Sequence, residues 1–187
     1  DLHSEVLRDY IKPSRPVFIP AGHPVDTMQK ENDALMALCG TMRTVLVELT
    51  ALPDNASASG QVQSLRGMFN ELMDVEKHYK RKENLLFSVL ERHGVSGPSK
   101  VMWGKDDEVR ALLKELGAAL AGGGDNAGEW KVAAAALATP TLAAVEEMVF
   151  KERQILLPMA LQTLTDDEWG EIWQQSPEYG WCLVEPG

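Results

Sequence analysis

The sequence predicts an all-α protein: an up-down-up-down four-helix bundle with short extra helices at its N- and C-termini. The chain is rich in Ala, Leu, Met, Glu and Lys and poor in β-branched runs, a mixture that favours helices over sheets. Apolar residues recur at steps of three, four and seven along four long segments separated by short loops. With 187 residues, 44% of them apolar, the chain can bury the core of one such domain.

Start and stop signals bound the four long segments. Proline is favoured at the first helical position, so Pro24 opens the first segment, and Gly94 ends the second. Pro140 and Pro158 fall inside the fourth segment, where we expect them to kink the helix. The long helices are expected over about 24–52, 61–93, 99–121 and 128–164.

The whole chain, residues 1–187, is expected to form one domain. Residues 1–20 comprise a short amphipathic helix and a proline-rich extended arm, residues 21–164 the bundle, and residues 165–187 a short last helix and a tail. A capping box, Thr165-Asp-Asp-Glu168, predicts the start of that last helix, because its side chains can satisfy free backbone N–H groups.

The charge and cysteine content exclude several classes of partner and cofactor. The formal net charge is -10, so neither nucleic acid nor an anionic membrane is expected to bind. No apolar run approaches the ~20 residues of a membrane span. The two cysteines, Cys39 and Cys182, form no CxxC motif for a zinc ribbon or a covalently attached haem. Two free thiols suit the reducing cytoplasm, which is the expected location.

Three polar residues fall on the apolar stripes of the predicted helices. Asp106 follows Met102 by four residues, and Glu152 follows Met148 by four, so both carboxylates should point inward. His78 occupies a similar position on the second helix. A buried carboxylate without a partner is costly, so these groups need one another, a basic side chain or a metal.

Ordinary structural roles can account for each of these residues taken alone. Asp106 could pair with Lys82 or Arg110, and Glu152 could pair with an adjacent basic residue at the surface. A single inward histidine such as His78 is commonly a hydrogen-bonded core residue, and inward methionines commonly fill gaps in a core. Only their combination indicates a functional site.

Five segments carry a resemblance to a known family. They are Gly22-His23-Pro24-Val25 with Glu31-Asn32, His78 to Phe87, Val101 to Arg110, Met148 to Ala160, and Tyr179 to Leu183. Together they resemble the hemerythrin-like (HHE) cation-binding family over about residues 20–184, most closely a subfamily found beside PAS sensor domains. The resemblance implies a hemerythrin-like four-helix bundle with a site inside it.

The resemblance also implies ligand positions, and the chain matches only some of them. Members with a di-iron centre are expected to supply a His from helix one, His-x3-Glu from helix two, His-x3-His from helix three, and a His with a carboxylate from helix four. His23, His78 and Glu152 match this pattern. With four histidines in the chain, five imidazoles on two irons cannot be supplied. Four positions depart from it. On helix two, Lys82 stands at the Glu position, with Glu83 one residue later. On helix three, Met102 and Asp106 stand at the two His positions, and on helix four Met148 stands at the His position.

The first hypothesis for the site is haem b. A four-helix bundle can hold this cofactor between its helices through one His and one Met, without covalent attachment. Two thioethers at positions where the family has imidazoles favour this cofactor. The candidate axial ligands are His23, His78, Met102 and Met148.

Two other hypotheses remain for the site. In the second, a non-haem iron, manganese or zinc ion is bound, although the ammonium group of Lys82 would repel a metal ion. In the third, the site has lost its metal and Lys82 pairs with Asp106 or Glu152. The candidate ligands for the second hypothesis are His23, His78, Asp106, Glu152 and Glu83.

The favoured function is a sensing or redox module in which an iron-containing centre binds O2, NO or an electron. Its expected partner is a PAS or another signalling domain, and homo-oligomer formation is compatible with the sequence. No nucleophile–base signature is visible, so an enzyme is not the favoured interpretation. The alternatives are a small redox enzyme acting on peroxide or nitric oxide at the same centre, and a cofactor-free interaction or signalling module.

Overall fold

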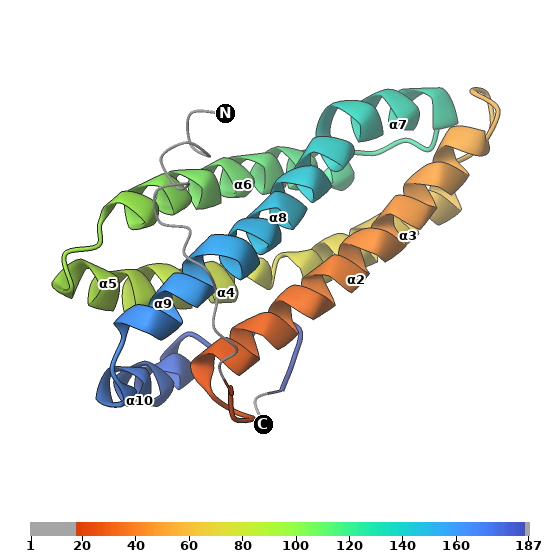
Figure 1. The fold of residues 1–187 in the computed structure, drawn as a ribbon. Coiled ribbons are helices and arrows are strands. Elements are labelled where there is room, and N and C mark those ends of the chain that lie inside the picture. The colour runs from red at the N-terminus through yellow and green to blue at the C-terminus, as the bar shows by residue number, and fades with distance from the viewer. Residues whose placement is uncertain (1–17, 186–187) are drawn as a thin grey trace.

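The computed structural model describes residues 18–185, and these form an all-α bundle (Figure 1). The expected helix over residues 1–11 lies outside the described part. The first long segment is α2, Pro24–Ala51, and the third is α6, Gly97–Ala121. The second contains α3 (Ser59–Leu72), α4 (Val75–Arg81), the π-helical segment η1 (Lys82–Phe87) and α5 (Ser88–Arg92). The fourth contains α7 (Ala127–Ala133), η2 (Ala134–Ala138), α8 (Thr139–Lys151), η3 (Glu152–Leu156) and α9 (Leu157–Thr163).

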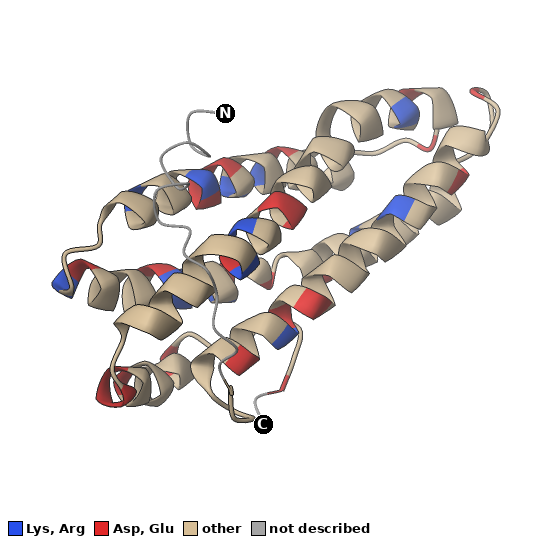
Figure 2. Cartoon of the chain, viewed as in Figure 1, with Lys and Arg blue, Asp and Glu red and all other residues tan. Residues whose placement is uncertain are grey.

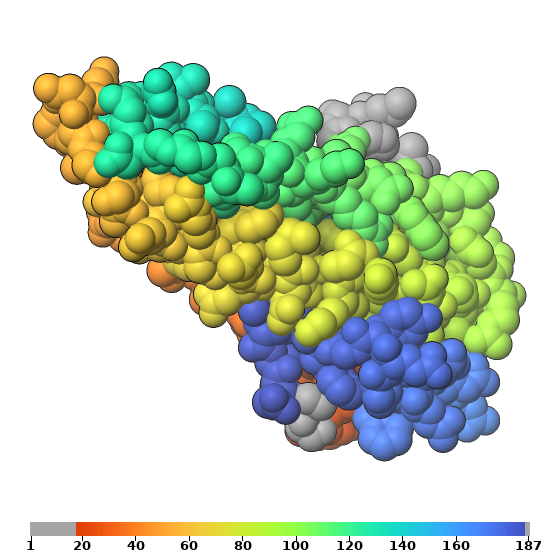
Figure 3. Space-filling model, turned by 180° about the vertical axis from the view of Figure 1, so that it is seen from behind, coloured from red at the N-terminus to blue at the C-terminus, as the bar shows by residue number. Residues whose placement is uncertain are grey.

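A last helix, α10 (Asp166–Gln175), lies across one end of the bundle. The predicted capping box is confirmed, since the Thr165 hydroxyl accepts from the Glu168 N–H and the Glu168 carboxylate accepts from the Thr165 N–H. A short 3-10 turn, Ser176–Glu178, and the tail follow. From behind, α10 and the tail are seen to lie along one edge of the second segment (Figure 3). The C-terminal residues therefore close the bundle on one side.

The second segment is not the single helix that the sequence predicts. Helix α3 ends at Leu72, and a turn at Met73 and Asp74 precedes α4. The chain tightens here because the Asp74 N–H bonds to the carbonyl of Glu71, three residues back. The Asp74 carboxylate also accepts the N–H of Leu183 at 3.4 Å. The bend thus provides an acceptor for the tail.

The fourth segment contains a π-helical turn just before each of its inner prolines. Segment η2 precedes Pro140, and segment η3 precedes Pro158. Proline lacks an N–H group, and its ring clashes with the carbonyl four residues earlier, so a wider turn accommodates it within a continuous helix. Segment η1 of the second helix is a π-helix without a proline, and it begins at Lys82.

The apolar stripes form one continuous core. The thiols of Cys39 and Cys182 are free and buried, and burial raises the pKa of Cys39 to about 12. Burial likewise raises the pKa of Cys182. Both are therefore neutral packing groups at physiological pH. Five methionines are buried in this core: Met28, Met42, Met102, Met148 and Met159.

Two helical stretches in the described residues are long and apolar enough to cross a membrane, judged by length and composition alone. They are α2 and Ala127–Thr163, which lie side by side in the bundle (Figure 1). Both stretches contain charged residues, so neither is an unbroken apolar run of membrane-spanning length.

We expect Leu142→Ala to destabilise the bundle by about 2–5 kcal/mol, because it removes a side chain with no exposed surface and leaves a cavity between helices. Urea unfolding followed by circular dichroism measures the effect. Met73→Ala, at a position 44% exposed, is the control and should cost much less. Equal losses for the two variants would contradict the assignment of the core.

Candidate functional site

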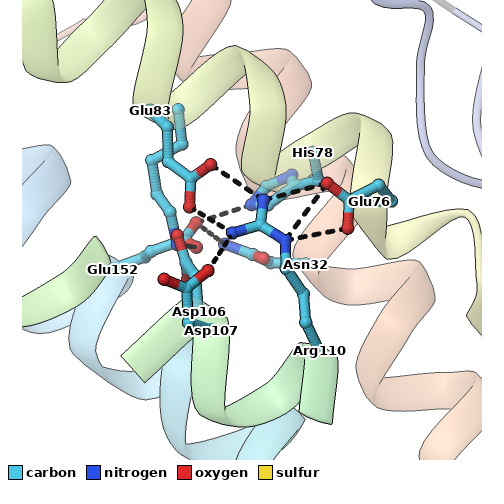
Figure 4. A network of polar contacts seen from close by, with 9 residues as sticks. Asn32, Glu76, His78, Glu83, Asp106, Asp107, Arg110 and Glu152 are labelled. Carbon is cyan, nitrogen blue, oxygen red and sulfur yellow. Dashed lines mark hydrogen bonds and ion pairs between the residues drawn. The ribbon is translucent and has the colours of Figure 1, made fainter. Parts of the chain in front are cut away.

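A cluster of charged and polar side chains is buried in the middle of the bundle (Figure 4). It draws on α2, on α4 and η1, on α6, and on η3. We call it the buried cluster. Its members are Glu31, Asn32, His78, Arg81, Lys82, Asp106 and Glu152.

Lys82 lies at the centre of the buried cluster and is completely buried. Its Nζ donates to Asp106 Oδ1 at 2.7 Å and to Glu152 Oε2 at 3.0 Å. Burial lowers the pKa of Lys82, but the two carboxylates outweigh this and raise it above its ordinary value. Lys82 is therefore an ammonium ion. The pairs that the third hypothesis predicts are present, and the interpretation of Glu152 as a surface ion pair is wrong.

His78 is held between two carboxylates. Its Nδ1 lies 3.0 Å from Glu31 Oε1, and its Nε2 lies 2.7 Å from Glu152 Oε1. An ionised carboxylate only accepts hydrogen bonds, so both ring nitrogens must carry protons. Burial opposes this charge, but Glu152 and Glu31 raise the pKa of His78 to about 9. Neither nitrogen is free to bind a metal.

Glu152 accepts from three donors at once. Besides His78 and Lys82, Asn32 donates to Glu152 Oε1 at 3.1 Å through Nδ2. Burial alone would raise the pKa of Glu152, yet the two neighbouring cations hold it well below its usual range. The carboxylate is therefore ionised at neutral pH.

Asp106 is only partly satisfied. Its Oδ1 accepts from Lys82, while its buried Oδ2 has no hydrogen-bond partner. Burial raises the pKa of Asp106 to about 8, with a smaller contribution from Glu83, although Lys82 lowers it. The free Oδ2 can therefore hold a proton near neutral pH.

Glu31 and Arg81 are members of the cluster that the sequence analysis missed. Arg81 donates to Glu31 through one NH2 group, and to the carbonyl of Gly180 at 2.8 Å through Nε. Glu31 also accepts the backbone N–H of Cys182. The spacing of Glu31, three residues after buried Met28, was a sequence signal that could have placed it inward.

Glu83 and Arg110 form a second ion-pair group beside the buried cluster (Figure 4). Arg110 donates to both oxygens of Glu83, each at 2.8 Å, and also to Glu76. The carboxylate of Glu83, predicted as an additional metal ligand, is thus engaged by a guanidinium. Arg110 pairs with Glu83 and Glu76, so of the two partners suggested for Asp106 it is Lys82 that binds it.

The structure brings together only part of the predicted ligand set. His78, Asp106 and Glu152 meet in the cluster, whereas His23 lies at the N-terminus of α2. There, His23 Nδ1 accepts from the Val25 N–H at 3.0 Å, and its ring lies 4.8 Å from that of Trp169, between centroids. Met102 and Met148, the predicted thioether ligands, are buried members of the apolar core.

These donors do not fit a metal centre. The ammonium group of Lys82 lies where the carboxylates of Asp106 and Glu152 converge, and a cation there repels a metal ion. His78, with both nitrogens protonated, cannot ligate a non-haem ion or a haem iron. Within residues 18–185, no group of three or more His, Cys, Asp or Glu side chains is arranged to hold a metal ion.

Comparison with known protein families identifies the family of the chain. The family model of the hemerythrin HHE cation-binding domain matches residues 22–160, and the chain belongs to this family. The resemblance is thereby confirmed at family level, while the PAS-associated subfamily stays a prediction. The family description suggests a metal-binding module of the iron type, a role that the donor set of this chain does not fit. No curated protein matches the chain at a significant level.

We expect the free energy of unfolding to fall as pH rises from about 6.5 to 9. The native state keeps a proton on His78 up to a pKa of about 9, whereas the unfolded chain releases it near 6.5. That stabilisation is complete below pH 6.5 and amounts to about 3 kcal/mol. Asp106 acts in the same direction. Its pKa is raised from 3.8 to about 8, so the native state keeps a proton there that the unfolded chain releases, and the free energy of unfolding falls further as pH rises toward 8.

Urea unfolding at a series of pH values measures this dependence. His78→Gln should flatten the curve between pH 8 and 9, and Asp106→Asn should flatten it mainly below pH 8. Stability that stays constant or rises between pH 6.5 and 9 in the unsubstituted protein would contradict a protonated, doubly bonded His78.

Proposed function

We propose that this chain is a hemerythrin-family module in which internal ion pairs replace the metal centre, and that it acts as a cofactor-free interaction or signalling domain. The position of Lys82 carries the proposal. Its ammonium group is bonded to the carboxylates of Asp106 and Glu152 at 2.7 and 3.0 Å. These carboxylates occupy positions that the family uses for ligands.

Charge compensation supports the same conclusion. The carboxylates of a metal site need positive charge when they are buried, because an isolated buried carboxylate is costly. In this chain the guanidinium of Arg81, the ammonium of Lys82 and the imidazolium of His78 supply that charge. A metal ion would have to displace bonded cations that belong to the chain itself.

The family match favours a second candidate function, the iron-containing sensing or redox module that the sequence suggests. This alternative requires Lys82 to leave the cluster and His78 to lose a proton. Because the carboxylates raise the pKa of both groups, each of these changes opposes metal binding. We therefore keep it as the outcome that the experiment must exclude. A PAS or another signalling domain remains the proposed partner under either function.

We expect the purified protein, expressed with iron and haem supplied, to contain substoichiometric metal and to show no Soret band. Metal analysis and absorption spectra of the same sample, oxidised and reduced, measure both quantities. Stoichiometric iron, manganese or zinc would overturn the proposal in favour of a non-haem centre, and a Soret band would overturn it in favour of haem.

We expect Lys82→Glu to create affinity for divalent metal, because it replaces the repelling cation by a carboxylate beside Asp106 and Glu152. Fe2+, Mn2+ or Zn2+ at about 100 times the Kd should then stabilise this variant by about 2.7 kcal/mol. Lys82→Met, of similar length without charge, is the matched control and should gain little. A rise in the melting temperature of the unsubstituted protein with the same ions would contradict the proposal.

A further inference from the structure

One face of the bundle is apolar and yet exposed. It is formed by α2 and α8, which carry few charged residues in the view of Figure 2. The most apolar 18-residue windows of α2 and of the stretch Ala127–Thr163 are only 28% and 33% buried. We call this surface the α2/α8 face. It is defined by the exposed residues Gly40, Thr44 and Val47 of α2 and Thr139, Ala143 and Phe150 of α8.

Three threonine hydroxyls of α2 on or beside this face are already satisfied. The hydroxyls of Thr41, Thr44 and Thr50 donate to backbone carbonyls four residues earlier, at 3.1, 3.2 and 2.9 Å. Their donors therefore need no water or partner group. These three hydroxyls can be covered by an apolar surface without becoming unpaired donors.

Phe150 projects from the α2/α8 face and is 60% exposed. It lies four residues after Glu146 and three before Arg153, on the same side of the helix. Glu146 pairs with Arg43 of α2, and Arg153 pairs with Asp33 of α2. Phe150 therefore stands above the line along which α2 and α8 meet.

A groove of about 550 Å³ opens on the same line, nearer to the start of α8. Along α8 its Thr139 precedes Phe150 by 11 residues, which corresponds to about 16 Å of helix. The groove is lined by Arg43, Leu46, Val47, Thr50, Ala51 and Thr139.

We propose that the α2/α8 face is the interface of a homodimer in which Phe150 of each copy fills the groove of the other. A twofold axis that crosses α8 between Ala144 and Val145 runs the two α8 helices antiparallel. It then places Phe150 opposite the partner's Thr139, because both residues are about equally far from the axis. One projection and one groove on each copy make the contact self-complementary, as a twofold interface requires.

The small residues and the size of the α2/α8 face agree with a second copy of the chain as its partner. Ala143 lies beside the axis, and a side chain added at Gly40 would meet no other atom within 4 Å, so the helices can approach closely. Two helices of 18 residues present about 27 by 20 Å, or about 540 Å² in projection. This is of the order of the ~800 Å² that each partner buries in a stable complex.

A lipid surface is the less suitable occupant. Amphipathic helices that bind membranes carry Lys and Arg beside their apolar face and gain from anionic lipids. This chain has a net charge of -10, and the basic residues on the face, Arg43 and Arg153, are paired with Glu146 and Asp33. A second copy requires no such positive rim.

Sedimentation velocity on the full chain tests the proposal. We expect a dimer at about 100 μM, and we expect Phe150→Ala to raise the dimer Kd about tenfold or more. Trp173→Ala, at a position 61% exposed on α10, is the matched control and should leave the Kd unchanged. A monomeric protein at this concentration, or a dimer indifferent to Phe150→Ala, would overturn the proposal. Binding of the monomer to phosphatidylcholine vesicles, if it is lost in Phe150→Ala, would also overturn the proposal, because a lipid surface would then be the occupant of the face.

Disulfide cross-linking tests the position of the axis separately. Ala143→Cys should form a disulfide between two copies under mild oxidation, because both copies present this residue close to the axis. Ala118→Cys, exposed on α6, should not, and the native thiols are buried. Equal cross-linking of both variants, or of neither, would contradict this position of the axis. The result does not depend on whether the buried cluster binds a metal, so it is independent of the proposed function.

Discussion

The ammonium group of Lys82 is the constraint on which the interior depends. A buried cation is tolerated only when its partners are well placed and are themselves satisfied, because desolvation otherwise outweighs the attraction. Asp106 and Glu152 satisfy Lys82, and His78 and Asn32 complete the hydrogen bonds of Glu152. The charged members of the cluster are thus held by one another, and removing Lys82 would leave the buried carboxylate of Glu152 with less compensating charge.

The helices are locally reshaped where they meet this network. Lys82 is the first residue of η1, and Glu152 is the first residue of η3, so two π-helical turns begin at the two ends of one ion pair. Such turns are rare within α-helices and frequently lie at functional sites. Pro158 accounts for η3. Segment η1 contains no proline, and its own sequence does not explain why a π-helical turn forms there.

Periodicity was sufficient to place the candidate site but not to describe its bonds. The apolar stripes correctly turned His78, Asp106 and Glu152 inward, since burial of a helix face is a local property of spacing. The partner of Glu152 is Lys82, 70 residues earlier, and the choice between it and an adjacent surface residue depends on how helices pack. The spacing of Glu31 after Met28 was enough to turn it inward, but its bonds to His78 and Arg81 depend in the same way on how other elements pack against it.

The attachment of the C-terminal tail to these charges has a mechanical consequence. Glu31 holds the backbone of Cys182, and Arg81, bonded to Glu31, holds the carbonyl of Gly180. Glu31 also shares His78 with Glu152, so the tail is anchored through two carboxylates to the centre of the bundle. The charge state of the interior and the docking of residues 180–182 are therefore linked equilibria: loss of the proton on His78 would weaken the anchoring of the tail, and release of the tail would weaken the bonds around His78.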